Sequence, residues 1–330
     1  DLSAPRTEGM GLVWFQYIFV GVRSVLYVFV AYRCLSILYR IVYPYFIGCP
    51  VNLHKKAAGK WAVITGATDG IGREYALQLG EKGFNILLVS RTQSKLDKTR
   101  LEVLARSKEA KIEVRTFAFD FSASSINEYD EIVAELRKYE VGILVNNVGA
   151  CFDSPNPMHL LDGGLPRLAD MTTINCLPVV LLCKVALDQM WPRRAGIIIN
   201  VASAAATVPI SEWNLYGASK RFVMHLSSIL HLEYAPYGIT VQCVCPMLVV
   251  TKMSKVERPS LLSPTPDQYV RSALRSVGLA SETSGYWVHQ IQVEGMKLLP
   301  PFIFNRIIDY NNVQAKKRLA RRTSFTRTII

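Results

Sequence analysis

Three side chains in the middle of the chain have the types and the spacing that proton transfer requires. Tyr216 follows Ser203 by thirteen residues, and Lys220 follows Tyr216 by four. Residues four apart on a helix share a face, so the Lys220 ammonium is expected beside the Tyr216 phenol. A free tyrosine has a pKa of about 10, and a neighbouring cation lowers it by stabilising the phenolate. Taken alone, YGASK at 216–220 is more simply a solvated helix face, so its chemistry depends on the segments around it.

Six short hydrophobic runs, separated by segments with helical spacing, follow residue 59. They cover residues 60–66, 85–91, 112–120, 141–147, 195–203 and 239–246. Each run is mostly apolar rather than alternating, which is typical of strands covered on both faces. This alternation of strand and helix predicts a single α/β domain with a doubly wound (Rossmann) parallel sheet. Ser203 ends the fifth predicted strand.

A glycine-rich loop joins the first predicted strand to the helix after it. The loop reads TGATDGIG, and its glycines are Gly66, Gly70 and Gly72. Glycine allows a tight turn and a close backbone approach, and the helix N-terminus offers free N–H groups to a phosphate. The spacing is G-x-x-x-G-x-G rather than the commoner G-x-G-x-x-G. The loop therefore predicts a dinucleotide site, with Thr68 and Ile71 also in contact with the cofactor.

The end of the second predicted strand indicates which dinucleotide binds. A site selective for NAD usually has an acid there, which holds the ribose 2′-hydroxyl. This chain has Ser90 and Arg91 instead. A hydroxyl and a guanidinium suit a 2′-phosphate, so these residues favour NADP(H) over NAD(H). The alternative is an ordinary surface arginine that follows a strand.

In combination, these residues resemble the short-chain dehydrogenase/reductase family. The resemblance covers residues 59–290 and rests on TGATDGIG, Asp120, NNVG at 146–149, IN at 174–175, Ser203 and YGASK. Segments such as EYAPYGITVQCVCP and TSGYWVHQIQ are similar to one branch, the microsomal very-long-chain 3-oxoacyl-CoA reductases and their 17-beta-hydroxysteroid dehydrogenase relatives. The chain departs from the pattern in reading PM where many members have Pro-Gly. It also lacks the dilysine retrieval signal common in the branch.

The resemblance implies four catalytic residues, Asn175, Ser203, Tyr216 and Lys220. Reduction of a ketone adds a hydride to carbon and a proton to oxygen, and Tyr216 is the expected proton donor, or the base in the reverse direction. Lys220 is expected to lower the tyrosine pKa and to hold the nicotinamide ribose. Ser203 is expected to polarise the substrate carbonyl through a hydrogen bond. Asn175 is expected to hold a water molecule that links Lys220 to solvent.

The resemblance also implies the contacts of the cofactor, NADP(H). Asp120 is expected to accept from the adenine amine, and Thr251 to contact the nicotinamide carboxamide. Asn146 is expected to line the adenine ribose and to brace the central strands, whereas Asn147 fits a structural hydrogen bond as well as a cofactor role. The full expected set is Gly66, Thr68, Gly70, Ile71, Gly72, Ser90, Arg91, Asp120, Asn146, Tyr216, Lys220 and Thr251.

No metal site is expected. The seven cysteines show no ligand spacing, and Cys243 and Cys245 lie in a run that predicts a buried strand. His225, His231 and His289 have no carboxylate or cysteine partner at ligand spacing, so we expect them to be packing or surface residues. An odd number of cysteines without any N-glycosylation sequon fits a domain that faces the reducing cytosol.

A long apolar stretch near the N-terminus predicts a membrane segment. From Leu12 to Tyr32 there are 21 residues with a single charge, Arg23. At 1.5 Å per residue this is about 31 Å, enough to cross a hydrocarbon core of about 30 Å. The alternatives are a buried helix of a soluble core, or a helix that lies in the membrane interface, which Arg23 would suit. The stretch is too long for a cleaved signal peptide. The basic residues after it predict a cytosolic C-terminal side; they are Arg33, Arg40, Lys55, Lys56 and Lys60.

The chain divides into three predicted parts. They are a membrane anchor and linker at 1–58, the Rossmann-type domain at 59–290, and an apolar segment with a basic tail at 291–330. The apolar segment EGMKLLPPFIFNRII fits a lid helix over the substrate or a segment that dips into the bilayer. The net charge of +12 comes partly from the tail, which suggests anionic lipid headgroups rather than nucleic acid as its partner, or a solvated, disordered tail.

Three functions are consistent with these features. The first is NADPH-dependent reduction of a 3-oxoacyl-CoA in very-long-chain fatty-acid elongation, which the branch resemblance and Arg91 favour. The second is reduction of a steroid or retinoid ketone, since the same four residues serve both. The third is a catalytically silent membrane scaffold, against which the intact catalytic residues argue. The resemblance further implies the endoplasmic reticulum membrane, a catalytic domain that faces the cytosol, a homodimer, and other elongation enzymes as partners.

Overall fold

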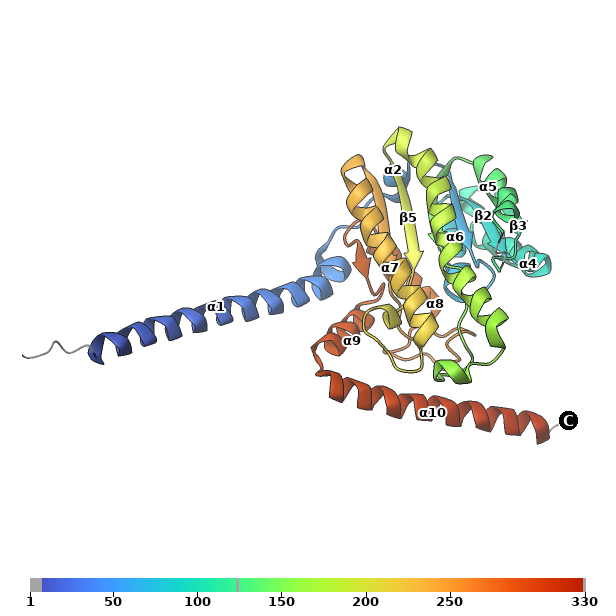
Figure 1. Cartoon of the computed structure of the whole chain (residues 1–330). Coiled ribbons are helices and arrows are strands. Elements are labelled where there is room, and N and C mark those ends of the chain that lie inside the picture. The colour runs from blue at the N-terminus through green and yellow to red at the C-terminus, as the bar shows by residue number, and fades with distance from the viewer. Residues whose placement is uncertain (1–7, 123–124, 329–330) are drawn as a thin grey trace, which may run out of the picture.

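A seven-stranded parallel sheet lies at the centre of the structure (Figure 1). The computed structural model describes residues 8–122 and 125–328, and the strand order within them is β3-β2-β1-β4-β5-β6-β7. The strands are β1 (Trp61–Thr65), β2 (Asn85–Ser90), β3 (Val114–Ala118), β4 (Val141–Asn146), β5 (Gly196–Val201), β6 (Ile239–Val244) and β7 (Glu282–Thr283). The predicted doubly wound parallel sheet is confirmed. β7 was not predicted, because two residues are too few to show a periodic pattern.

The order of the strands selects one place for a ligand. The chain adds β2 and β3 on one side of β1, and then returns to add β4 to β7 on the other side. Ligands of such sheets bind outside the carboxyl ends of the strands, where this direction reverses. The glycine loop leaves the carboxyl end of β1, and NNVG leaves that of its neighbour β4. The two motifs therefore meet at the reversal point.

Helices cover both faces of the sheet (Figure 1). The helices that follow the N-terminal one are α2 (Leu53–Ala57), α3 (Gly70–Glu81), α4 (Gln93–Arg106), α5 (Asp130–Arg137), α6 (Gly164–Arg193), α7 (Asn214–Tyr234), α8 (Pro266–Arg275), α9 (Trp287–Leu298) and α10 (Pro301–Thr328). One apolar cluster packs α6 and α7 against the sheet through residues such as Leu182 and Val223. The cluster on the opposite face packs α3 and α8 through Tyr75 and Tyr269. The central strands are buried at every position, which explains their continuous apolar sequences.

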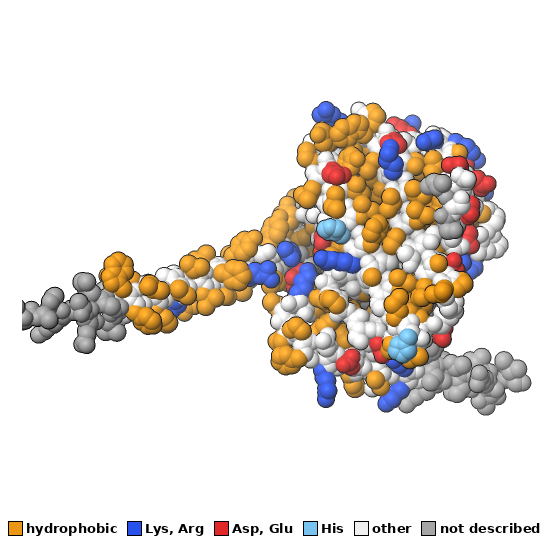
Figure 2. All heavy atoms as spheres, in the orientation of Figure 1, with side chains coloured by type: hydrophobic (Ala, Val, Ile, Leu, Met, Phe, Trp, Pro, Cys, Tyr) orange, Lys and Arg blue, Asp and Glu red, His pale blue; other side chains and the backbone are white. Residues whose placement is uncertain are grey.

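The N-terminal helix α1 (Glu8–Val42) projects away from the domain (Figure 1). From Trp14 to Leu35 every side chain is exposed, and most of these side chains are apolar (Figure 2). The described residues contain two helices long and apolar enough to cross a membrane, and α6 is the second. α6 is partly buried against the sheet, whereas the apolar window of α1 is not buried at all. An exposed apolar helix of this length fits a membrane segment, whereas α6 is a core helix.

The root of α1 is fixed to the domain. A short π-helical turn, η1 (Tyr43–Ile47), follows α1, and its Tyr45 is buried. The Tyr45 hydroxyl lies 2.5 Å from Thr283 Oγ1 of β7. Arg275 Nε of α8 donates to Tyr45 O at 3.0 Å. The turn that follows α1 is therefore packed directly onto the domain.

The C-terminal apolar segment forms α9 and α10, which are separated by a break at Leu299. Figure 1 shows α10 running along the domain beneath the ends of α6 and α7. Phe304 and Asn312 of α10 are buried against the domain, while Phe302 is exposed. The side chains of most of the predicted basic tail, from Arg318 onward, lie outside the described residues.

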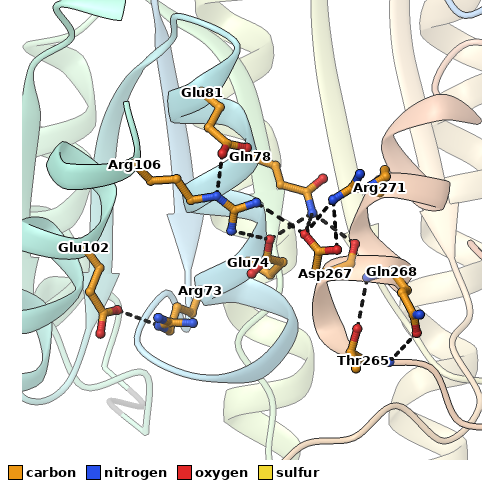
Figure 3. A network of polar contacts seen from close by, with 10 residues as sticks. All are labelled: Arg73, Glu74, Gln78, Glu81, Glu102, Arg106, Thr265, Asp267, Gln268 and Arg271. Atoms are coloured by element: carbon orange, nitrogen blue, oxygen red, sulfur yellow. Dashed lines mark hydrogen bonds and ion pairs between the residues drawn. The ribbon is translucent and has the colours of Figure 1, made fainter. Parts of the chain in front are cut away.

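Arg106 joins three helices through carboxylates (Figure 3). From the end of α4 it contacts Glu74 and Glu81 of α3 at 3.0 and 2.5 Å, and Asp267 of α8 at 3.3 Å. Burial alone would lower the pKa of Arg106, but these carboxylates outweigh it and raise the pKa. Glu74 is buried, so its charge depends on this partner and on Gln78, whose Nε2 donates to it at 2.9 Å. The network holds α3, whose N-terminus faces the glycine loop, against α8.

Replacing Arg106 by methionine should lower the free energy of unfolding by about 2–4 kcal/mol, because it leaves the buried Glu74 carboxylate without its cation. Thermal unfolding of the detergent-solubilised full chain measures this. The matched control is Arg115→Met, whose ion pair with Glu113 is largely exposed on both sides and should contribute no more than about 0.5 kcal/mol. Equal melting temperatures for the two variants would show that the network does not hold the helices together.

Candidate active site

The glycine loop after β1 forms a cradle lined by backbone. Gly66 and Gly70 have φ angles of +64° and +52°, which other residues rarely adopt. A Cβ on Gly72 would lie 2.3 Å from Asn147 Nδ2 and 2.4 Å from Gly66 O, so no larger residue fits. Asp69 caps α3 by accepting from Gly70 N at 2.8 Å. The cradle and the N-terminus of α3 together have the form of a phosphate site.

Two neighbouring asparagines at the end of β4 face opposite sides of the sheet, as successive strand residues do. Asn147 Nδ2 donates to Thr65 O at 3.0 Å and to Gly66 O at 3.2 Å, so Asn147 holds the glycine loop. Asn146 is buried, and its Nδ2 donates to Asn200 Oδ1 of β5 at 2.9 Å. The expected bracing of the central strands by Asn146 therefore agrees with the structure. Its side chain lies in the core between β4 and β5, and its expected contact with the adenine ribose stays a prediction.

The expected adenosine-binding residues lie along the adjacent ends of β1, β2 and β3. Thr68 Oγ1 lies 3.1 Å from Ser90 Oγ, so the glycine loop and the end of β2 are in contact. Arg91 is exposed, and the described residues include no ion-pair partner for it. Asp120 is exposed just after β3, and Ile71 packs partly into the apolar cluster below the loop. Arg91 is therefore open to a ligand, whereas Asp120 Oδ1 already accepts from Ser122 N at 3.0 Å.

Ser203, Tyr216 and Lys220 converge at the carboxyl end of β5. Ser203 follows β5 and caps the short turn η5 (Ala204–Ala206). Tyr216 lies in the first turn of α7, and its hydroxyl is hydrogen-bonded to the Ser203 side chain. Lys220 lies one turn further along α7, is buried, and donates from Nζ to Val201 O at 3.0 Å. The three groups therefore occupy one site, as their spacing predicts.

Burial dominates the acid–base behaviour of this site. Together with the nearby Cys151 thiol it raises the pKa of Tyr216 to about 12, and the hydrogen bond with Ser203 opposes the rise. Burial also lowers the pKa of Lys220. The net shift of the Tyr216 pKa is opposite to the lowering expected from Lys220, because removing water from the phenolate disfavours the charged form.

Asn175 ties two elements together at the centre of the site. From α6 its Oδ1 accepts from Ala150 N at 2.8 Å, and its Nδ2 donates to Ala150 O at 3.0 Å and to Ser219 Oγ at 2.9 Å. A Cβ on Gly149 would lie 3.0 Å from Lys220 Nζ and 3.2 Å from Asn175 Oδ1. Asn175 and Lys220 therefore flank the same small space. The water molecule expected there stays a prediction.

The segment after β6 folds back over the glycine loop. Thr251 Cγ2 lies 2.9 Å from the position of a Cβ on Gly70, and Lys252 Nζ pairs with Asp69 at 2.9 Å. Ser254 was not singled out from the sequence, yet its N donates to Thr251 Oγ1 at 3.2 Å and so closes a tight turn. Thr251 is therefore placed over the phosphate cradle. Its expected contact with the nicotinamide is compatible with this position.

A salt bridge joins two chain segments on the opposite side of the site. Lys255 Nζ contacts both O and Oδ1 of Asp153 at 2.9 Å, which joins the segment after β6 to the loop after β4. The two residues are 102 apart in the sequence, so no local pattern could have revealed the contact. Within 8–122 and 125–328, no group of three or more His, Cys, Asp or Glu side chains is placed to hold a metal ion.

His289 of α9 joins that helix to both ends of the segment 247–262. Its Nδ1 accepts from Met247 N at 3.3 Å, and its Nε2 lies 3.2 Å from Leu262 O. A single neutral imidazole, protonated on Nε2, satisfies both contacts. Burial lowers the pKa of His289 to about 4, although its hydrogen bonds oppose the shift. The expected packing role is therefore correct, but the contact with the Pro246–Met247 segment was missed.

Protonation of His289 should destabilise the protein as the pH falls. The pKa of about 4 in the fold lies below the unfolded value of about 6.5, so the unfolded chain binds more protons between these values. This contribution to stability is complete above pH 6.5 and is lost as the pH falls towards 4, by up to about 3 kcal/mol. Melting temperatures between pH 4 and 8 test this. His289→Gln should flatten the profile, whereas the exposed control His159→Gln should not. Parallel profiles for both variants would contradict the assignment.

The geometry of the site agrees with comparisons of the whole chain. A family model described as short chain dehydrogenase matches residues 60–261. A very-long-chain 3-oxoacyl-CoA reductase of Caenorhabditis elegans is 47% identical over 307 residues, which cover 93% of this chain and 96% of that protein. A putative steroid dehydrogenase 1 of the same species is 41% identical over 312 residues, which cover 94% and 98%.

A solved structure extends the likeness to three dimensions. The short-chain dehydrogenase from Sphingobium yanoikuyae, in complex with NADPH, superposes with a TM-score of 0.57 at 26% identity. The superposition covers 65% of this chain and 82% of that one. The matched family region contains the glycine loop, Asn175, Ser203, Tyr216 and Lys220. The chain therefore belongs to the short-chain dehydrogenase family.

Proposed function

We propose that this protein is an NADPH-dependent reductase that converts the ketone of a 3-oxoacyl-CoA to a hydroxyl group in very-long-chain fatty-acid elongation. The observation that carries the proposal is the meeting of Ser203, Tyr216 and Lys220 beside a glycine cradle. The chain is 47% identical, over almost its full length, to a relative that carries a reductase name of this kind.

The residues around the cradle fit NADP(H). Gly72 has no room for a Cβ because Asn147 and Gly66 O pack against it, which holds the start of α3 close to the glycine loop. Arg91 and Ser90 supply a guanidinium and a hydroxyl at the end of β2, where a 2′-phosphate would lie. Asp120 is exposed at the end of the next strand, where it could accept from an adenine amine. When bound, NADPH supplies the hydride for the substrate carbon.

The residues of this chain handle the proton and the carbonyl oxygen. Ser203 donates a hydrogen bond to that oxygen and polarises the carbonyl. Tyr216 then transfers its hydroxyl proton to the oxygen as charge develops there. A pKa of about 12 keeps Tyr216 protonated at neutral pH, which suits a proton donor in the direction of reduction. Lys220 stabilises the phenolate that remains, and Asn175 lies where a water molecule could return the proton from solvent.

A second candidate substrate is a steroid ketone. It is favoured by the putative steroid dehydrogenase relative, which is 41% identical over 94% of this chain. The proton donor and the cofactor site would be the same for both substrates. The difference lies in the substrate walls, which the segments after β4 and β6 form and the Lys255–Asp153 contact joins.

The exposed apolar helix α1 supports attachment to the endoplasmic reticulum membrane, with the domain on the cytosolic side where basic residues follow the helix. The lipid substrate, and partner enzymes of elongation, would share that membrane. Exposed apolar side chains on α6 and α7 support a homodimer through these helices. They are Val180, Trp191, Phe222, Ile229 and Leu232.

The proposal is tested by NADPH and NADH consumption with the detergent-solubilised full chain. A long-chain 3-oxoacyl-CoA and a panel of 17-ketosteroids are offered separately. We expect turnover of NADPH with the acyl-CoA, and a loss of kcat of at least about 100-fold in Tyr216→Phe, because that variant has no proton to give. The control Tyr237→Phe, at a partly exposed tyrosine beyond α7, should keep full activity. Turnover with steroids alone would select the second candidate, and full activity in Tyr216→Phe would exclude the mechanism.

Arg91→Ala should reduce the preference for NADPH over NADH by about 10- to 100-fold, since the guanidinium contributes a charge-assisted contact with the 2′-phosphate. Dissociation constants of the two cofactors, measured by fluorescence titration, give the ratio. Lys98→Ala removes an exposed positive charge from the helix that follows β2 and should leave the ratio unchanged. An unchanged ratio in Arg91→Ala would mean that another group selects the cofactor.

A further inference from the structure

α10 is attached to the turn that leads into the catalytic helix. Asn312 is 5% exposed, and its Oδ1 accepts from Trp213 Nε1 at 3.1 Å while its Nδ2 donates to Ser211 O at 3.0 Å. One helical turn later, Lys316 Nζ contacts Glu212 Oε1 at 2.8 Å. A single face of α10 therefore holds three consecutive residues, Ser211, Glu212 and Trp213, which lie immediately before α7.

This turn has a backbone that needs outside support. Glu212 has a φ angle of +67°, in the left-handed region that residues other than glycine rarely adopt. Its Oε2 is also buried, and the described part of the chain offers it no hydrogen-bond partner. Such a conformation costs about 1–3 kcal/mol and persists only where the surrounding structure fixes it. The three polar contacts from α10 supply that support.

Trp213 packs against Tyr216 and so links the position of the turn to that of the phenol ring. The two rings meet edge to face, with centroids 6.1 Å apart and an interplanar angle of 63°. Gly217 N donates to Trp213 O at 2.7 Å, so Trp213 also begins the hydrogen bonding of α7. A shift of the indole would therefore move both the phenol ring and the first turn of the helix that carries it.

The same turn supports the loop on the other side of the site. Asn156 N donates to Glu212 O at 3.1 Å, and Asn214 Nδ2 donates to Asn156 O at 3.1 Å. This loop also contains Asp153, the partner of Lys255 across the site. Support from α10 thus reaches both the proton donor and the substrate wall.

We propose that Asn312 and Trp213 are positioning residues for the reaction, and that α10 holds Tyr216 in position beside Ser203. α10 lies beyond residues 60–261, which the family model matches. The proposal rests on the proposed function, in which Tyr216 gives its proton to the substrate.

The first test does not depend on any substrate. Amide hydrogen exchange is compared in Asn312→Ala and in Asn311→Ala, which removes an exposed asparagine at the adjacent position. In the full-length protein, Asn312→Ala should speed exchange in peptides covering 211–217 and 153–157, and leave the central strands unchanged. Asn311→Ala should match the unmodified protein. Equal exchange in the two variants overturns the proposal.

The second test separates positioning from folding. Asn312→Ala should lower kcat by about tenfold, because a small displacement of a reacting group is costly, while the dissociation constant of NADPH stays the same. Entry of water beside Tyr216 should also move the alkaline limb of the kcat profile to lower pH. Trp213→Phe, which keeps a ring but loses the N–H, should behave in the same way, and the double variant should lose no more than either single one. An unchanged alkaline limb, or independent losses that multiply, overturns the proposal.

Failure of the proposed function would look different. If the unmodified protein turned over no 3-oxoacyl-CoA, the exchange comparison would still decide the role of α10. If Asn312→Ala did not fold, Lys316→Met would take its place, because it removes only the contact with Glu212. Its control is Lys317→Met, at the exposed neighbouring position. Faster exchange at 211–217 in Lys316→Met alone supports the proposal, and equal exchange overturns it.

Discussion

The burial of one ammonium group sets the conditions for the rest of the active site. Lys220 is 4% exposed, and taking such a charge out of water costs several kcal/mol unless polar groups replace the water. The carbonyl of Val201 at the end of β5 is one replacement. The chain after β4 approaches closely as well, and a Cβ on Gly149 would lie only 3.0 Å from Lys220 Nζ. Asn175 holds this approach by bonding both backbone groups of Ala150. A parallel sheet makes the arrangement possible, since it brings the carboxyl ends of neighbouring strands together.

The same exclusion of water sets the protonation state of Tyr216. A phenol with a raised pKa stays protonated at neutral pH, which is the state that a proton donor needs. The loop after β4 and the segment after β6 are joined by Lys255 and Asp153. The protonation state of Tyr216 therefore depends on how the site is packed as well as on the residue type.

Local sequence patterns determined which features could be predicted. The features that could not be predicted depend on which face of a strand a side chain occupies, and on contacts between residues that are distant in the sequence. The apolar runs gave the parallel sheet, and the spacing of Tyr216 and Lys220 placed both on one helix face. Asn146 and Asn147 are the same residue type at adjacent positions, and only the facing of β4 decided which one holds the glycine loop. The direction of the Tyr216 pKa shift could not be predicted, because the spacing between Tyr216 and Lys220 carries no information about burial. Asn312 carried no signal, because its partners lie about a hundred residues away.

The direct docking of η1 has a consequence for how the molecule moves. A glycine- or serine-rich linker would let a tethered domain sample a wide range of positions above its membrane. Here Tyr45 is buried in the domain and bonded to β7 and α8, so the end of α1 is held against the domain. If α1 crosses the bilayer, the domain keeps only rotation about the helix axis and the tilt of that helix. The packing of η1 against the domain then limits the range of distances between the active site and the lipid surface.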